Sequence, residues 1–314
     1  MSTIAVILPA YNEELTIVET IEQFHRVLPE AKIVVIDNNS QDKTSPLSKE
    51  TLSRLGNSGV VIFEGRQGKA NAMRRAFLEI NADVYLVCDA DMTYPANRAF
   101  DLIGPVLRSE ADMVVGDRQS DGSYKVENKR KFHMFGNNLV LRFIKLLFNA
   151  GLNDVMSGYR ALSKNFVKNY PILVDGFQIE VDMTLYALDK RYRILEVPIE
   201  YKDRPLGSFS KLNTFTDGAK VIFAIIQTFR YYKPFAFFSW LGTIFAILGL
   251  ITAIPVFKDW VQFQYIHHVP LAILAAGIEI LAALFFGVGL ILDAIARNEK
   301  ARSELNLLNS SFLD

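Results

Sequence analysis

The chain has 314 residues, of which 22% are charged, and its formal net charge is zero. This balance excludes the overall basic character of a typical nucleic-acid-binding protein, and the length suffices for one large domain and a further module. Cys88 is the single cysteine, so an internal disulfide bond is excluded. Residues 1–3 lead straight into a short apolar run without a basic segment, and we therefore expect no secretory signal peptide.

The first two hundred residues alternate short apolar runs with amphipathic segments. The runs expected to form buried strands are 4–9, 32–37, 59–64, 83–91 and 111–118. The segments expected to form helices are 14–28, 42–55 (with a break near Pro46), 69–80 and 96–109. Strands and helices that take turns predict an α/β domain whose mostly parallel sheet is covered on both faces.

Polar segments follow each of the five predicted strands. They read "PAYNEE", "DNNSQDKT", "EGRQGKAN", "DADMTYP" and "GDR" in chain order. The carboxyl ends of parallel strands lie at one edge of a sheet, so these segments are expected to line one ligand site. The chain has no G-x-G-x-x-G after the first strand and no G-x-x-x-x-G-K-[ST], which excludes the usual dinucleotide and P-loop fingerprints.

The fourth of these segments carries an acidic pair, Asp89 and Asp91. Taken alone, the pair is also compatible with an ordinary strand-to-loop turn. Two carboxylates with this spacing can hold Mg²⁺ or Mn²⁺ together with the oxygens of a diphosphate. Arg66 and Lys69 could offset the charge of such a diphosphate as it leaves, the alternative being a solvated loop.

The blocks "PAYNEE", "DNNSQDKT", "GKANAMRRAF" and "DADMTYP" resemble the inverting polyprenol-phosphate glycosyltransferases. This family includes enzymes like dolichol-phosphate mannose synthase and bacterial undecaprenyl-phosphate enzymes with two membrane spans. The blocks "DVMSGYRALS", "GFQIEVDMTLYA" and "DRPLGSFSKLN" continue the resemblance over the first two-thirds of the chain. It implies a GT-A-like domain that binds a nucleotide sugar and transfers a hexosyl group to a polyprenyl phosphate, undecaprenyl or dolichyl, with a divalent metal.

The resemblance also implies roles for individual residues. Those implied in donor binding are Pro9, Tyr11, Glu13, Asp37, Arg66, Lys69, Asp89 and Ser210. Those implied in catalysis are Asp89, Asp91, Arg204 and Lys211, with Asp89 and Asp91 as metal ligands. Those implied in binding the acceptor phosphate are Arg118 and Arg130.

Two departures from the family pattern limit these implications. Thr93 stands where relatives often have Gln, which leaves its place in the metal shell open. The familiar D-D-G-S run is D-N-N-S here, with Asn38 and Asn39, so the nucleoside base stays open between UDP and GDP, the bacterial-type anchor favouring UDP. The sugar and the length of the polyprenol are also undetermined.

A phosphate acceptor can react without a general base, independently of any family resemblance. A phosphomonoester has a second pKa of about 6, so it is mostly dianionic at neutral pH and can attack the anomeric carbon without a general base. Direct displacement inverts that carbon.

Two other functions are alternatives to transfer onto a polyprenyl phosphate. One is a processive polysaccharide synthase, which would need more membrane spans and a Q-x-x-R-W block. The other is a non-catalytic nucleotide-sugar sensor, which would lose the acidic pair or the "SK" loop.

Two apolar segments, 235–257 and 270–292, are each long enough to cross the ~30 Å core of a membrane as a helix. Glu279 is the only charged residue in them, and we expect it to be protonated or to face a neighbouring helix. Lys and Arg are enriched on the outer flanks, which predicts an inner-membrane protein with the catalytic domain and both termini in the cytoplasm.

Amphipathic patterns over 125–149 and 214–233 predict helices that rest on the membrane surface, the alternatives being a packed domain helix and a linker. The expected domains are 1–212 (catalytic), 213–234 (juxtamembrane helix), 235–292 (two-span anchor) and 293–314 (cytoplasmic tail). Anchors of this kind often assemble, and we expect a homotetramer.

Overall fold

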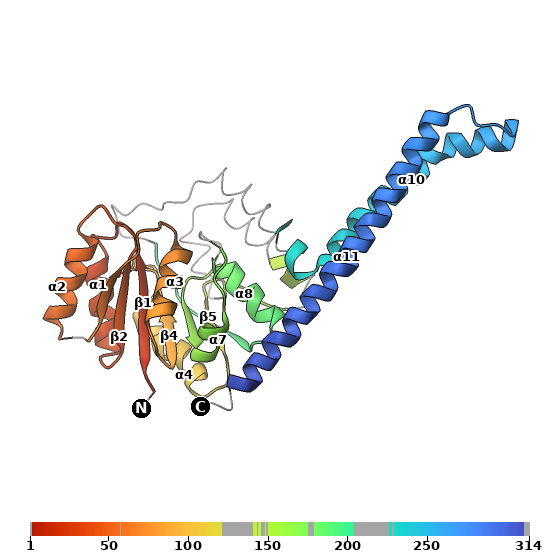
Figure 1. Cartoon of the computed structure of the whole chain (residues 1–314). Helices are drawn as coiled ribbons and strands as arrows, with labels where there is room; N and C mark the ends of the chain where they lie inside the picture. The colour runs from red at the N-terminus through yellow and green to blue at the C-terminus, as the bar shows by residue number, and fades with distance from the viewer. Residues whose placement is uncertain are drawn as a thin grey trace. The chain divides into compact units, whose positions relative to one another are not determined.

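The computed structural model divides into two compact units, residues 1–219 and 220–314, and each is described by itself (Figure 1). The residues that the structure describes are 2–56, 58–120, 141–142, 144–145, 148, 150–174, 179–203, 226–227 and 229–310. The predicted surface helices over 125–149 and 214–233 therefore lie mostly outside the described residues.

The described part of the first unit contains a seven-stranded sheet in the order β3-β2-β1-β4-β6-β5-β7. Its strands are β1 (Ile4–Ala10), β2 (Lys32–Asp37), β3 (Val60–Phe63), β4 (Val84–Val87), β5 (Met113–Asp117), β6 (Arg160–Ser163) and β7 (Ile194–Pro198). The pairing is parallel except at β6, which runs antiparallel between β4 and β5. The mostly parallel sheet and the five expected strands are confirmed, with somewhat different ends.

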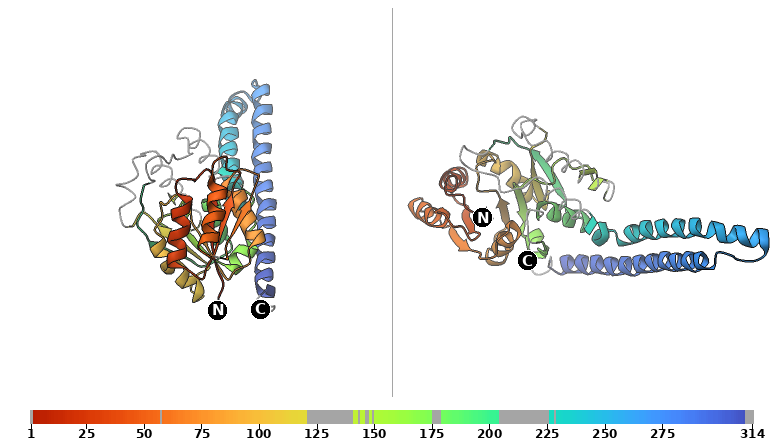
Figure 2. Two further views of the ribbon diagram at one scale, coloured as in Figure 1. Left: turned by 90° about the vertical axis from the view of Figure 1, so that its left-hand side faces the viewer. Right: turned by 90° about the horizontal axis from the view of Figure 1, so that it is seen from above.

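The helices of this unit connect the strands and cover the sheet (Figure 2). Those that the structure describes from end to end are α1 (Ile17–Val27), α2 (Thr44–Arg54), α3 (Lys69–Glu79), the short 3₁₀ helix η1 (Ala96–Arg98), α4 (Ala99–Leu107), α7 (Lys164–Asn169) and α8 (Ile179–Asp189). The expected break near Pro46 does not occur. Pro46 falls in the first turn of α2, where the missing backbone N–H is not needed by the helix.

The core lies on both faces of the sheet. Val6 and Leu8 of β1 are fully buried in one cluster with residues of α1 and α4, whereas Ile7, between them, points to the opposite face. Strands buried on both faces explain the continuous apolar runs in the sequence. The sheet is therefore a rigid frame, and its carboxyl edge presents the loops that carry polar residues.

The second unit contains two long helices that pack antiparallel, α10 (Pro234–Phe263) and α11 (Val269–Ser310) (Figures 1 and 2). Both are long and apolar enough to cross a membrane. Small residues recur every seven positions at their contact, Gly242 and Gly249 on α10 and Ala275, Ala282 and Gly289 on α11. Small side chains let two helices approach closely.

Glu279 lies at this helix contact. A Cβ atom on Gly249 would meet its Oε1 atom at 2.5 Å, so the carboxyl group faces α10, one of the two expectations for it. The helix α11 continues to Ser310, so most of the segment expected as a tail, 293–314, is helical.

Candidate active site

Asp89 and Asp91 follow β4 directly, at the carboxyl edge of the sheet. Asp91 is only 4% exposed, and its Oδ1 atom accepts hydrogen bonds from the hydroxyl of Thr93 at 2.6 Å and from the backbone N–H of Thr93 at 3.1 Å. Met92, between them, has a positive φ of 61°. The short turn thus fixes the carboxylate of Asp91 by hydrogen bonds from the residue two positions later.

Asp89 is held from the other side by Lys69, the first residue of α3. The ammonium group of Lys69 forms ion pairs with Asp89 and with Glu180 of α8, the second with a distance of 2.5 Å. Burial by itself lowers the pKa of Lys69, but the two carboxylates raise it well above its usual value. Lys69 therefore stays charged and contacts Asp89, and its side chain is only 9% exposed, so it does not stand in a solvated loop.

The loop between β3 and α3 carries Arg66. Its guanidinium forms two hydrogen bonds of 2.9 Å with the carboxylate of Glu64, which holds the pKa of Glu64 at about 2. Asn38 fixes this loop, since its Nδ2 atom donates to the carbonyls of Glu64 and Arg66, and its Oδ1 atom accepts from the N–H of Gly68 at 2.8 Å. The amide that replaces an acid at position 38 thus has a structural role.

The loops after β1 and β2 bind one another. The N–H of Asn12 donates to Ser40, and the N–H of Glu13 donates to the hydroxyl of Thr44 at 2.8 Å. Asp37 is buried, and its Oδ1 atom accepts from the N–H of Ser40 at 3.0 Å. Pro9 pairs with β2 within β1, and Tyr11 is half-buried in the adjoining loop. The four residues expected in the nucleoside pocket therefore lie at neighbouring strand ends: Pro9 and Asp37 near the ends of β1 and β2, and Tyr11 and Glu13 in the loop after β1.

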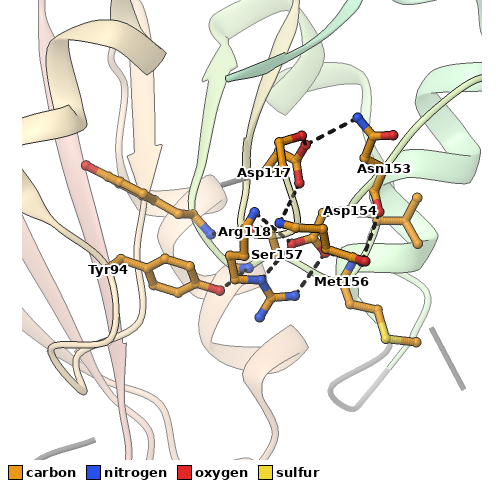
Figure 3. Close-up of polar contacts among 12 residues, drawn as sticks. Tyr94, Asp117, Arg118, Asn153, Asp154, Met156 and Ser157 are labelled. Carbon is orange, nitrogen blue, oxygen red and sulfur yellow. Dashed lines mark hydrogen bonds and ion pairs between the residues drawn. The ribbon is translucent and has the colours of Figure 1, made fainter. Parts of the chain in front are cut away.

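Arg118 follows β5 and is almost completely buried. Its side chain lies beside that of Asp154 (Figure 3). Its Nε and Nη2 atoms donate to the two carboxylate oxygens of Asp154 at 2.7 and 2.9 Å, and its guanidinium lies 5.6 Å from the ring centroid of Tyr201. Asp117 accepts from the Nδ2 atom of Asn153 at 3.2 Å. The end of β5 and the loop that begins at 153 are thereby joined.

The loop 153–158 is fixed by three further side chains. Glu196 accepts from the N–H of Asp154, and Arg160 donates to the carbonyls of Val155 and Ser157 at 2.7 and 2.8 Å. The hydroxyl of Tyr94 accepts from the N–H of Gly158 at 2.9 Å. Sequence reasoning assigned no role to this loop, although it lies in the block "DVMSGYRALS" that carried part of the resemblance.

The structure thus brings Asp89, Lys69 and the unpredicted Glu180 into one network, and it places Arg66 and Arg118 in ion pairs with carboxylates. The remaining expected site residues lie outside the described residues: Arg130, Arg204, Ser210 and Lys211.

The acidic pair fits a divalent cation by its chemistry, since carboxylate oxygens are the ligands that hard cations prefer. Among the described residues there is no group of three or more His, Cys, Asp or Glu arranged to hold a metal by themselves. A cation bound at Asp89 and Asp91 would complete its shell with oxygens of a diphosphate and of water, the usual arrangement for Mg²⁺.

A mostly parallel sheet with one antiparallel strand, and an acidic pair after β4, are the features of a GT-A-like fold. The fold is shared with glucosyl-3-phosphoglycerate synthase of M. tuberculosis, with a TM-score of 0.57 and 20% identity over 73% of this chain and 80% of that chain. Crystals of that enzyme have also contained Mn²⁺ and UDP-glucose.

Residues 5–170 match the sequence model of glycosyl transferase family 2, and the chain belongs to this family. Glycosyltransferase AglJ of Haloferax volcanii is 28% identical over 93% of this chain and 91% of its own length. Dolichol-phosphate mannosyltransferase of Pyrococcus furiosus is 30% identical over 79% of this chain and 68% of its own length. The protein is therefore a glycosyltransferase, as the sequence blocks predicted.

Proposed function

We propose that the protein transfers a hexosyl group from a nucleotide sugar to the phosphate of a polyprenyl phosphate, with inversion and with a divalent metal. The observation that carries the proposal is the presence, in one chain, of an apolar helix hairpin and of a GT-A-like unit with the acidic pair Asp89 and Asp91, of which Asp91 is buried and Asp89 is partly exposed. A soluble acceptor would not require such a hairpin, whereas a lipid-linked acceptor lies in the membrane. The name of the Pyrococcus furiosus relative supports the same acceptor class.

The residues support a reaction without a general base. A phosphate dianion is already a nucleophile at neutral pH, so the site needs to position two anions and to stabilise the leaving nucleoside diphosphate. Mg²⁺ or Mn²⁺ at Asp89 and Asp91 would supply positive charge against that leaving group. The side chain of Arg66 is 59% exposed, and its guanidinium would turn from Glu64 toward the diphosphate when the donor binds.

The other expected contacts are part of the proposal. Arg204, Ser210 and Lys211 would bind the donor phosphates, and Arg118 and Arg130 the acceptor phosphate. Arg118 would bind the phosphate while it stays paired with Asp154, and this ion pair fixes the orientation of the guanidinium. Two spans with Lys and Arg on their outer flanks would keep the catalytic unit at the cytoplasmic face of the cell membrane.

The test uses the full chain in membranes, a radiolabelled nucleotide sugar, Mn²⁺ and a short polyprenyl phosphate. A panel of UDP- and GDP-linked hexoses identifies the donor by the rise in thermal unfolding midpoint that a ligand of the folded state produces. Label in the organic phase supports the proposal. Label in a long water-soluble polymer would instead indicate a processive synthase, and nucleotide binding without turnover would indicate a sensor.

A further inference from the structure

The side chain of Glu180 is a buried carboxylate with no assigned part in the proposed reaction. It extends from the first turn of α8 and is 5% exposed. Its Oε1 atom lies 2.5 Å from Nζ of Lys69, and the same ammonium group contacts Asp89. Lys69 therefore bridges one carboxylate of the acidic pair and one carboxylate that lies behind it.

The packing around this bridge is tight. A Cβ atom on Gly158 would lie 2.6 Å from Oδ2 of Asp89 and 2.8 Å from Nζ of Lys69. Both charged groups therefore rest against the backbone of the loop 153–158. The backbone at Gly158 thus lies against the ion pair of Lys69 and Asp89, of which the Lys69 side chain is only 9% exposed.

The charges of the three groups sum to a single negative charge. If Lys69 faced Asp89 alone, the ammonium would cancel the negative charge that attracts a divalent cation. Glu180 supplies a second anion for the same ammonium. Arg160, a fully buried cation on β6, donates instead to the carbonyls of Val155 and Ser157 and to the hydroxyl of Thr184.

We propose that Glu180 is a positioning residue that acts through Lys69. It takes up the charge of Lys69, so that Asp89 is held in one orientation by the ammonium and still carries a net negative charge toward a divalent cation. The inference rests on the proposed metal-dependent transfer and extends it to a residue outside the acidic pair.

The first test compares Glu180→Gln with Asp182→Asn in the full chain in detergent. Asp182 is the matched control, since it lies on the same helix and accepts a hydrogen bond of 2.6 Å from Tyr170, outside the network of Lys69. Binding of Mn²⁺ alone is measured by the electron paramagnetic resonance signal of the free ion. We expect Glu180→Gln to weaken Mn²⁺ binding by roughly tenfold to a hundredfold, the usual range when a group that supports the metal ligands is lost, because Lys69 would then neutralise Asp89 alone. Asp182→Asn should bind like the wild type.

The second test is a double variant, Lys69→Met with Glu180→Gln. Removing both charges restores the net charge around Asp89, so Mn²⁺ affinity should recover toward the wild-type value. A residue that merely supports the fold would show no such recovery. Replacing a buried ion pair by uncharged groups is often neutral for stability. If Glu180→Gln alone does not fold, the Mn²⁺ affinity of the double variant therefore still tests the role of Glu180.

Wild-type affinity in folded Glu180→Gln, or a double variant as weak as or weaker than the single one, would overturn the inference. The proposed sugar transfer and the proposed role of Glu180 can be refuted independently. A wild type that transfers no sugar from any donor refutes the proposed function, while the Mn²⁺ measurements still decide the role of Glu180. Sugar transfer by the wild type together with unchanged Mn²⁺ affinity in Glu180→Gln refutes the role of Glu180 alone.

Discussion

Gly158 lies so close to Asp89 that a Cβ atom at position 158 would come within 2.6 Å of the Oδ2 atom of that carboxylate. The two residues belong to different loops, one after β4 and one before β6, and Tyr94 fixes the second loop by accepting a hydrogen bond from the N–H of Gly158. The absence of a side chain at 158 is thus a condition for the position of the acidic pair.

Gly158→Ala should therefore displace Asp89 and Lys69. We expect a large loss of sugar transfer and of Mn²⁺ binding, with a loss of stability of about 1–3 kcal/mol from overpacking. Gly151→Ala is the matched control, because a Cβ atom there meets nothing within 4 Å. Activity, Mn²⁺ affinity and thermal unfolding midpoint are compared for both variants, and a Gly158→Ala protein indistinguishable from the control would contradict the close packing.

Asp91→Asn should lower the rate of sugar transfer by about a hundredfold or more, since the negative charge that would hold the divalent cation is lost. The protein should stay folded. Thr93→Val removes the hydroxyl that donates to Asp91 at 2.6 Å but keeps the carboxylate, so its effect should be smaller. Asp101→Asn, at an exposed ion pair on α4, serves as the control. Near-normal turnover in Asp91→Asn would remove this residue from the site.

Arg118→Met should destabilise the protein by about 3–5 kcal/mol, because it leaves the buried carboxylate of Asp154 without its charged partner. Adding Asp154→Leu should recover much of that stability, since both buried charges are then absent. The free energy of unfolding in detergent measures both steps. Sugar transfer should stay low in the double variant, and its full recovery would exclude Arg118 from acceptor binding.

The pair of Glu64 and Arg66 predicts a component of acid sensitivity. The guanidinium holds the pKa of Glu64 at about 2, below its unfolded value of about 4.3, so the pair stabilises the fold above pH 4.3 and this contribution is lost as the pH falls toward 2. The difference in unfolding midpoint between the wild type and Glu64→Gln should therefore shrink over this range. High salt should also reduce the difference in unfolding midpoint between the two proteins, because Arg66 is largely exposed and salt screens its charge. Glu50→Gln, at an exposed position of α2, is the control, and a wild-type-to-Glu64→Gln difference independent of pH would contradict the assignment.

The hairpin of α10 and α11 depends on close contact at Gly249. Gly249→Leu should force Glu279 and α11 away and lower stability in detergent by about 1–3 kcal/mol. Gly277→Leu places the same side chain on α11 where a Cβ atom meets nothing within 4 Å, so it should have little effect. Unfolding followed by helix content distinguishes the two, and equal stability would argue against the small-residue contact.

Five of the seven strands described in the first unit, its acidic pair and the apolar hairpin could be predicted from the sequence. Each depends on local pattern: a buried strand on a continuous apolar run, a span on the length of an uncharged segment, and the position of Asp89 and Asp91 on the end of a strand. Two strands escaped prediction, since β6 is only four residues long with a fully buried Arg160 and β7 mixes polar and apolar residues.

Only the tertiary structure decided which charges meet. The sequence places Lys69 in a glycine-containing loop that suggests an exposed donor contact, but the fold buries it between Asp89 and Glu180, two carboxylates from distant segments. In the same way, Arg118 and Asp154 meet only because β5 and β6, which they follow and precede, are neighbours in the sheet. Local pattern carries no information about such pairs, because burial and opposite charge act between residues that the chain brings together only after it has folded.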